Sequence, residues 1–259
     1  MGADVSNERA RIARVLLAGR RLALIGGAGC LLLGVVAPAL LAGCAAQPTT
    51  GFQRARNLQQ GAIEVGGAIS LARRPTEGAL VARADEGQEG EPVLAPPIPA
   101  LFFRTGITER LDAGLEAWPG GLKLHGKLGI LDEDKLMLAL IGTLGWYSTG
   151  WAPEDGDRFA ARGPLVSLQA PLATRVLPWL ELNVSPVVEL LQLEAERWVY
   201  LELQRRSFVT LHSGFTFGAN FAVWRVRINP EVALLGGYRG DREEGFWGVY
   251  PGVGAFIVF

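Results

Sequence analysis

Strict alternation of apolar and polar residues is the feature of this sequence that most restricts its fold. Between residues 122 and 130, for example, leucines alternate with Lys123, His125 and Lys127. Successive side chains of a β-strand point to opposite faces, so this segment forms a strand with one apolar and one charged face. Similar segments recur from about residue 62 to Phe259, and 34 glycines disfavour helices. The sequence therefore predicts an all-β fold.

The alternation predicts ten strands, at 62–71, 99–107, 111–117, 122–130, 136–146, 164–173, 180–190, 198–217, 226–234 and 247–259. The stretch 198–217 is longer than the roughly 9–11 residues that a membrane strand needs. It either extends beyond a bilayer or divides into two strands. We expect an antiparallel up-and-down β-barrel of about ten strands, and the pattern is compatible with eight to twelve.

The predicted connections alternate in length. Short ones at 108–110, 132–135, 174–178 and 218–222 are interleaved with longer ones at 73–98, 148–163, 191–197 and 236–246, and Pro119-Gly120 is a tight turn within this series. Short turns on one side, long loops on the other and an even strand count resemble the construction of bacterial outer-membrane barrels. With ten strands, both ends of such a barrel lie on the periplasmic side.

The C-terminus carries a second resemblance. Apolar residues alternate through Val253, Ala255 and Ile257 to a terminal Phe259. This pattern resembles the C-terminal signature of outer-membrane barrels, which the insertion machinery reads, although Ile257 stands where that signature has an aromatic residue. The resemblance covers residues 61–259 as a pattern and implies a membrane-spanning barrel.

Six tryptophans lie at predicted strand ends. Indole combines an apolar body with a polar N–H, so tryptophan gathers at the two interfaces of a membrane. We therefore predict an aromatic girdle made of Trp118, Trp146, Trp179, Trp198, Trp224 and Trp247. The alternative is a soluble barrel whose tryptophans cap its core.

The N-terminal segment is predicted to be an export signal. Five arginines between residues 9 and 21 precede an apolar run from Leu22 to Leu41. The run ends in Leu41-Ala42-Gly43-Cys44, which resembles the lipobox of bacterial lipoproteins. The resemblance implies cleavage before Cys44, a covalent lipid on that residue and no other cofactor. An uncleaved membrane helix is the alternative, since about 20 apolar residues can span a bilayer.

Three regions follow from these assignments: a signal peptide at 1–43, a lipid-anchored linker at 44–60 and the barrel domain at 61–259. Ala45 stands where an aspartate would resemble an inner-membrane retention signal. We therefore expect the outer membrane as the location, with the N-terminus anchored from the periplasmic side. The expected partners are outer-membrane lipid, the lipoprotein-processing machinery and the barrel-insertion machinery.

The polar faces of the strands carry charges of both signs. Pairing Trp118 with Gly121 across the turn places Glu116 beside Lys123 and Asp112 beside Lys127, and opposite charges at facing positions stabilise a sheet. The predicted lumen charge network consists of Asp112, Glu116, Lys123, Lys127, Arg225, Arg227 and Glu231. Such a network fills a narrow barrel, or it lines a selective pore or binding cavity.

Several functions are disfavoured. A net charge of −1 gives no electrostatic footprint for nucleic acid. Cys30 and Cys44 both lie near the N-terminus, and the only histidines are His125 and His212, so no metal site is expected. His212 is followed by Ser213, but adjacent strand residues point to opposite faces and cannot easily act together as base and nucleophile. We expect no enzyme.

Three hypotheses remain in order. The first is an outer-membrane lipoprotein barrel with a structural, narrow-pore or solute-binding role. The second is a periplasmic, lipid-anchored soluble barrel that binds a small apolar ligand, as lipocalins do. The third is a membrane-embedded hydrolase that modifies lipid A. The first two hypotheses differ in which face of each strand points into the barrel. In a soluble barrel Leu124 and Ile228 point inward and Lys127 and Arg227 point outward, and in a membrane barrel the two faces are exchanged.

Overall fold

The computed structural model describes residues 47–48, 54–73, 97–151, 158–199, 202–239 and 242–259. The chain divides into units Met1–Leu41 and Ala42–Phe259, and every described residue belongs to the second unit. The predicted signal peptide, with Leu41, Ala42 and Gly43, and the predicted lipidation site Cys44 therefore lie outside the described residues. No helix in the described ranges is long and apolar enough to cross a membrane.

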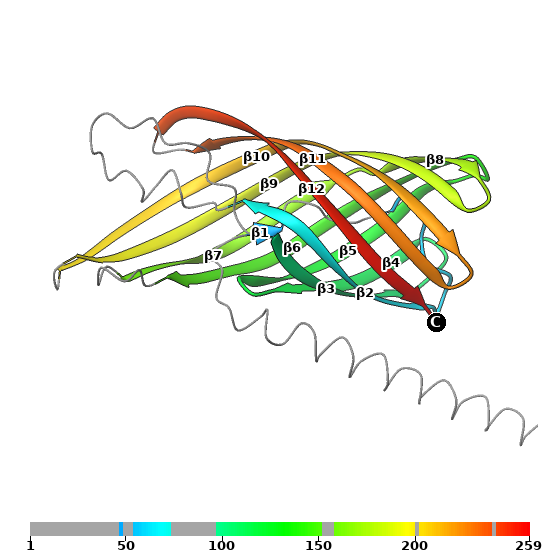
Figure 1. Ribbon diagram of the computed structural model, residues 1–259, viewed down its shortest axis with the longest axis horizontal. Helices are drawn as coiled ribbons and strands as arrows, with labels where there is room; N and C mark the ends of the chain where they lie inside the picture. The colour runs from blue at the N-terminus through cyan, green and yellow to red at the C-terminus, as the bar shows by residue number, and fades with distance from the viewer. Residues whose placement is uncertain (1–46, 49–53, 74–96, 152–157, 200–201, 240–241) are drawn as a thin grey trace, which may run out of the picture. The chain divides into compact units, whose positions relative to one another are not determined.

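Eleven strands close into a barrel, and one short strand precedes them (Figure 1). They are β1 (Gln47–Pro48), β2 (Ile63–Arg73), β3 (Pro97–Gly106), β4 (Leu111–Trp118), β5 (Gly121–Asp132), β6 (Leu136–Trp151), β7 (Arg158–Gln169), β8 (Leu172–Leu177), β9 (Leu180–Val199), β10 (Glu202–Val223), β11 (Val226–Arg239) and β12 (Arg242–Val258). All pairings are antiparallel, and β2 closes the ring by pairing with both β12 and β3. Because β7 and β8 each pair with both β6 and β9, they are two parts of one strand. The predicted ten-stranded barrel is confirmed.

The interruption between β7 and β8 falls inside the predicted strand 164–173. Pro171 has no backbone N–H, so it cannot donate to a neighbouring strand. Its carbonyl still accepts a hydrogen bond from the N–H of Ala139 at 3.1 Å, and the N–H of Ala170 donates to the carbonyl of Pro186 at 3.1 Å. The strand therefore breaks locally without leaving the barrel wall.

The barrel has two distinguishable ends. The end that contains Phe259, which we call the turn end, also holds the turns at 107–110, 133–135, 178–179 and 224–225. The other end, the loop end, holds the remaining connections, including the tight turn at 119–120, which is confirmed. The predicted connections at 174–178 and 218–222 are wrong, because β8 and β10 continue through them. The true turns are Pro178-Trp179 and Trp224-Arg225, and Trp224 has a φ of 56°.

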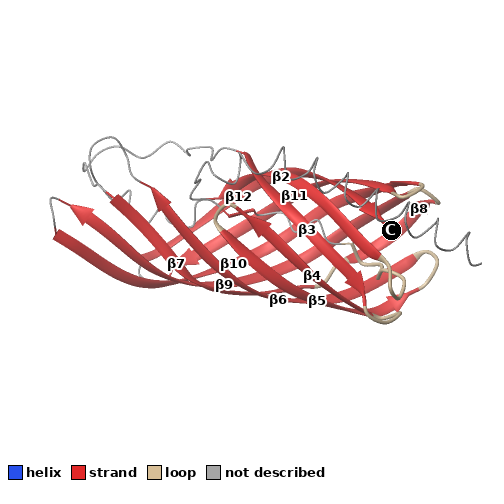
Figure 2. Cartoon of the chain, turned by 90° about the horizontal axis from the view of Figure 1, so that it is seen from below, coloured by secondary structure: helices blue, strands red, loops and turns tan. Residues whose placement is uncertain are grey.

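The loop end is uneven, because the strands are tilted and differ greatly in length (Figure 2). β4 and β5 meet at residues 119–120, whereas β9 and β10 run for 20 and 22 residues and form the longest hairpin. The predicted loop at 191–197 is therefore wrong, since β9 continues to Val199 in unbroken register with β10. Of the two alternatives for the stretch 198–217, division into two strands is wrong for residues 202–217, because β10 is one continuous strand, whereas residues 198–199 belong to β9.

The exposed fractions of the side chains show which face of each strand points outward. Leu124 is 58% exposed and Ile228 is 48% exposed, whereas Lys127 is 4% exposed and Asp112 is 2% exposed. The apolar face of these strands thus forms the outer wall and the charged face lines the interior. This is the reverse of a soluble lipid-binding barrel, so the second hypothesis is wrong for this part of the wall.

Candidate functional site

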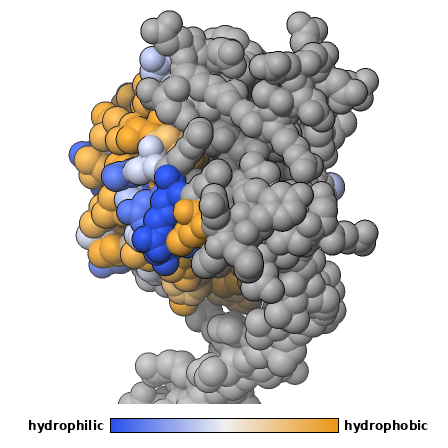
Figure 3. All heavy atoms as spheres, turned by 90° about the vertical axis from the view of Figure 1, so that its left-hand side faces the viewer, coloured by the Kyte–Doolittle hydropathy of each residue, from blue (hydrophilic) through white to orange (hydrophobic). Residues whose placement is uncertain are grey.

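The outer wall carries an apolar belt. Outward-facing leucine, isoleucine, valine and phenylalanine side chains are exposed on every strand from β4 to β11; β5 contributes Leu122, Leu124, Leu128 and Ile130. An exposed apolar band of this extent has no favourable contact with water, but it matches the hydrocarbon layer that a membrane barrel faces. Figure 3 views the loop end and shows a hydrophilic patch beside the hydrophobic wall.

The tryptophans whose side chains the structure describes lie at the edges of this belt, with one exception. Trp146, Trp179 and Trp224 are exposed on the outer wall, and Trp179 stacks on Phe221 with ring centroids 6.2 Å apart. Trp118 is only 3% exposed and points into the barrel, so its assignment to the girdle is wrong. It shares the parity of Asp112 and Glu116 on β4, which the sequence alone would have revealed. Trp198 and Trp247 lie in β9 and β12, but their side chains are outside the described set.

The predicted pairing of charges around the tight turn is present in the interior. Asp112 faces Lys127 and Glu116 faces Lys123 in the register of β4 with β5. The ammonium of Lys127 lies 2.6 Å from Asp112 Oδ2. Lys123 instead forms its ion pair with Glu189 Oε2 on β9, at 3.8 Å. The register of β4 with β5 could thus be predicted from the sequence, whereas the ion pair of Lys123 with Glu189 on β9 could not.

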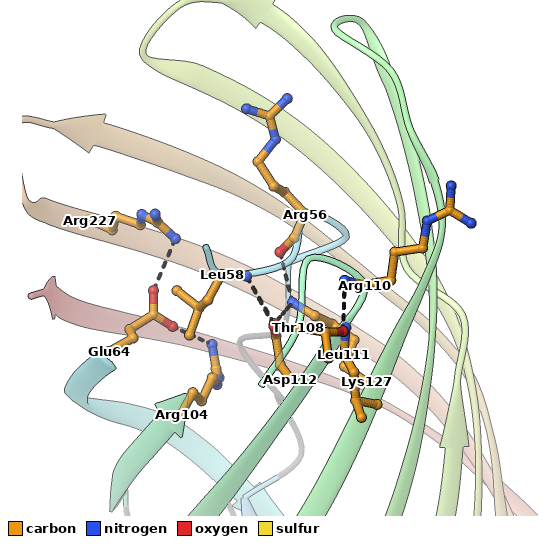
Figure 4. A network of polar contacts seen from close by, with 10 residues as sticks. All are labelled: Arg56, Leu58, Glu64, Arg104, Thr108, Arg110, Leu111, Asp112, Lys127 and Arg227. Atoms are coloured by element: carbon orange, nitrogen blue, oxygen red, sulfur yellow. Dashed lines mark hydrogen bonds and ion pairs between the residues drawn. The ribbon is translucent and has the colours of Figure 1, made fainter. Parts of the chain in front are cut away.

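Glu64 is a central residue that the sequence analysis missed. Its two carboxylate oxygens accept hydrogen bonds from Arg104 Nη1 at 2.9 Å and from Arg227 Nη1 at 3.0 Å (Figure 4). The Arg104 guanidinium also lies over the rings of Phe102 and Phe256, at 5.2 and 5.1 Å from their centroids. Glu64 and Arg104 are direct partners across β2 and β3. Their register depends on a long connection at 74–96, so it could not be read from the sequence.

Two further predicted members of the network behave differently. Glu231 is buried in the interior, as expected. Arg225 is exposed in the turn between β10 and β11, where its guanidinium lies 5.3 Å from the ring centroid of Trp224. Its inclusion in the lumen network is therefore wrong, because β11 begins only at Val226.

A segment that precedes the barrel fills the turn end of its interior. Arg54, Ala55, Asn57 and Leu58 are buried there, and we call residues 54–58 the plug segment. The N–H of Leu58 donates to both carboxylate oxygens of Asp112 at 3.1 Å. Lys127 Nζ donates to the carbonyl of Arg56 at 2.7 Å, as Figure 4 shows. The region predicted as a simple linker therefore binds the ionic network.

The wall is shaped to accept the plug segment. Ala55 packs with Met137 and Ala173 in a small apolar cluster. A Cβ added at Gly106 would lie 2.2 Å from the carbonyl oxygen of Gln59, so only glycine allows the backbone to approach there. The plug segment is thus packed by shape as well as by charge.

The interior changes character towards the loop end. On β9 the outward residues after Leu190 are Gln192 and Glu194, while Leu191 and Leu193 point inward and are fully buried. These leucines belong to an apolar cluster with ten other buried side chains: Ala68, Ile98, Ala100, Phe102, Trp118, Tyr147, Ala161, Leu165, Phe208 and Phe256. The polarity of the wall is therefore inverted beyond the belt, as in a soluble barrel.

In the described part of the chain, His212 and Ser213 do not come together as a reaction centre. His212 is buried and its Nδ1 lies 3.2 Å from Glu189 Oε1, whereas Ser213 is exposed on the outer wall. The prediction that these neighbours point to opposite faces is confirmed. Within the described ranges, no group of three or more histidine, cysteine, aspartate or glutamate side chains could hold a metal ion.

The fold and the interior define a class: a closed antiparallel barrel with an apolar outer belt, an ionic interior and a plug. No protein-family profile matches the sequence, and neither does any curated protein. Among solved structures, the chain is similar to Ail, the attachment invasion locus protein of Yersinia pestis. The identity is 13% and the TM-score 0.39, over 78% of this chain and 100% of that one.

Two further barrels give similar values. The N-terminal β-barrel domain of Pseudomonas aeruginosa OprF has 13% identity and a TM-score of 0.33, with 78% of this chain and 100% of that one covered. Neisserial surface protein A has 12% identity and a TM-score of 0.32, with 76% and 99% covered. At TM-scores below 0.5, these similarities do not decide the function of this chain.

Proposed function

We propose that this chain is an outer-membrane lipoprotein whose barrel is a closed structural unit and neither an open channel nor an enzyme. The observation that carries the proposal is the filled interior. Ion pairs and the plug segment occupy the turn end, and an apolar cluster occupies the region towards the loop end. Ten strands give only slightly more interior space than the eight that side chains alone can fill.

The membrane location is supported by the outer wall. The apolar belt faces outward on successive strands, with Trp179 and Trp224 at its turn-end edge. The C-terminal residue also closes the barrel: the N–H of Phe259 donates to the carbonyl of Ile63 at 2.8 Å, and the N–H of Ile63 donates back at 3.2 Å. The C-terminal residue that resembles an insertion signature therefore contributes to the strand pairing that closes the barrel. The lipobox supports a lipid on Cys44 and export.

The proposal is tested with the full-length protein expressed in a diderm bacterium. We expect the protein in the outer-membrane fraction, with faster gel migration before boiling than after it and with acyl groups on the N-terminal peptide in mass spectrometry. Cys44→Ser abolishes the acylation and leaves the heat-modifiable barrel. In planar bilayers the purified protein gives no steady conductance. A stable conductance would replace the structural role by a narrow pore, and loss of the protein on carbonate extraction would refute the membrane barrel.

A further inference from the structure

The plug segment is held through its backbone, in the way that a peptide ligand is held by a receptor. The N–H of Leu58 donates to both carboxylate oxygens of Asp112 at 3.1 Å, and the carbonyl of Arg56 accepts from Lys127 Nζ at 2.7 Å (Figure 4). Side chains of the wall make both contacts to main-chain groups, which every peptide carries. These contacts therefore depend on the course of the backbone and not on the side chains of the segment.

The side chains of the plug segment add selectivity. Ala55 packs with Met137 and Ala173, which leaves room for a small apolar residue. Arg56 reaches the rim of the turn end, where its Nε lies 3.4 Å from Asp132 Oδ1. In peptide recognition, main-chain hydrogen bonds commonly supply affinity and side-chain sites supply specificity. The turn end therefore presents both components of a peptide site.

The charge of the interior favours a basic occupant. Among the inward side chains of the wall that the structure describes, histidines aside, the carboxylates are Glu64, Asp112, Glu116, Glu181, Glu189 and Glu231. The lysines and arginines of the same set are one fewer: Arg104, Lys123, Lys127, Arg175 and Arg227. Arg54 is 6% exposed and brings a further positive charge into this interior. Because a buried charge is costly unless it is compensated, a cation at this position suits the wall.

A tight turn between Gln59 and Ala62 tethers the plug segment to the wall. The N–H of Ala62 donates to the carbonyl of Gln59 at 2.9 Å, and Gly61 has a φ of 75°, as a type II turn requires at its third residue. Gly106, the last residue of β3, accepts the N–H of Gly61 at 2.8 Å and donates to the carbonyl of Ala62 at 3.0 Å. The turn therefore reverses the chain directly before β2 begins at Ile63.

The ring of strands closes through pairings that do not involve the plug segment. β2 pairs with β12 over residues 64–70 and with β3 over residues 63–71, and Ile63 exchanges backbone hydrogen bonds with Phe259. The contacts described above for the plug segment are with side chains of β4, β5, β6 and β8. The segment is therefore a ligand inside a complete ring and not one of its strands.

We propose that the turn-end interior is a binding site for an extended basic peptide, and that residues 54–58 are the ligand held there in cis. The contacts define the peptide: cations at the positions of Arg54 and Arg56, a small apolar residue at that of Ala55, and a backbone N–H and C=O that meet Asp112 and Lys127. A basic segment of another chain with this pattern competes with the plug segment. The inference goes beyond the closed structural barrel, because it makes the closure exchangeable.

Binding of a free peptide to the full-length protein in detergent tests the inference. The probe is a fluorescent peptide with the sequence of residues 54–58 and blocked ends, followed by anisotropy. In Ala55→Trp the new side chain is too large for the site beside Met137 and Ala173, so the cis ligand is displaced. We expect this variant to bind the free peptide about tenfold or more tightly than the parent does. Replacing Arg54 and Arg56 by serine weakens the cis ligand without adding bulk, and should have the same effect.

Neighbouring carboxylates supply matched controls in the Ala55→Trp background. Asp132→Asn removes the partner of Arg56 and should weaken peptide binding about two- to fivefold, whereas Glu133→Gln should leave it unchanged. A peptide with both arginines replaced by glutamate should bind about tenfold or more weakly. Heat-modifiable migration shows that each variant is folded. If neither displaced variant binds the peptide, or if both peptides bind equally, the inference is overturned. The proposed function is tested by fractionation, acylation and conductance of the parent, so the two can fail separately.

Discussion

Asp112 and Lys127 form an ion pair of 2.6 Å that is also the binding site of the plug segment. The carboxylate accepts the N–H of Leu58, and the ammonium donates to the carbonyl of Arg56. Each charge therefore satisfies one polar group of the plug-segment backbone in addition to its ionic partner. Removing one charge leaves the other buried and unpaired, together with an unsatisfied peptide group.

We expect Asp112→Asn to lower the free energy of unfolding by about 3–5 kcal/mol, the cost of breaking a buried ion pair. Urea unfolding of the barrel in lipid vesicles measures it. The control is Arg205→Gln, which breaks an exposed pair with Glu196 of 3.0 Å and should cost less than about 1 kcal/mol. Adding Lys127→Met to Asp112→Asn should restore part of the loss. Equal effects of Asp112→Asn and Arg205→Gln would contradict the role of the pair.

Gly106 allows the second prediction, because its missing side chain leaves room for the backbone at Gln59. We expect Gly106→Val to displace the end of the plug segment and to produce a conductance in planar bilayers that the parent lacks. The matched control is Gly142→Val on the outer wall, where an added Cβ meets nothing within 4 Å. A Gly106→Val barrel that is folded, heat-modifiable and still closed would show that the segment does not seal the interior.

The alternation of residues was sufficient to predict most of the wall. Parity on β5 assigned Leu124 outward and Lys127 inward, and the tight turn at 119–120 fixed the register of the charges on β4 and β5. Both results depend only on the two-residue period of a strand and on one short turn. The same parity argument, applied to Trp118, would have placed it inside.

The length of β9 was missed for a physical reason. From Leu180 to Leu190 the apolar residues other than Val187 have even numbers, and from Leu191 onward they have odd numbers. In the sequence this reversal resembles a loop that resets the pattern. In the structure the backbone is continuous, and only the direction of the apolar side chains changes: they face outward up to Leu190 and inward from Leu191.

The plug segment has no comparable signature. Residues 54–58 have no alternation, and each of their contacts is with a strand distant in the sequence, so only closure of the barrel brings them together. The same holds for Glu64, whose partners Arg104 and Arg227 lie 40 and 163 residues away. Sequence patterns report local periodicity, whereas these contacts depend on the complete ring.

The apolar belt gives the third prediction. Leu140 lies on the outer wall of β6, midway between the ends of its apolar face at Leu136 and Trp146. We expect Leu140→Arg to cost about 2–4 kcal/mol of stability in lipid vesicles, as for arginine at a bilayer midplane. Gln192→Arg, on the outer wall beyond the belt, should be nearly neutral. If both variants unfold at the same urea concentration, the outer wall does not face hydrocarbon.

The fourth prediction concerns Glu64, which balances two guanidinium groups at 2.9 and 3.0 Å in the interior. Glu64→Gln keeps the shape of the side chain but removes the carboxylate charge that pairs with both Arg104 and Arg227. Because this leaves two buried positive charges near each other, we expect a loss at least as large as the ~3–5 kcal/mol of a single broken buried pair. The measurement is urea unfolding, with the temperature at which the compact gel form disappears as a second readout.

A matched carboxylate separates this effect from a general sensitivity to charge. Glu181 pairs with Arg175 at 3.5 Å near the turn end, and both side chains are partly exposed. Water can therefore screen Arg175 when its partner is lost, so Glu181→Gln should be much milder. Adding Arg227→Met to Glu64→Gln removes one of the two guanidinium groups that Glu64 pairs with and should recover part of the stability. No recovery, or equal losses at Glu64 and Glu181, would show that Glu64 acts by packing and not as the ionic centre of the barrel.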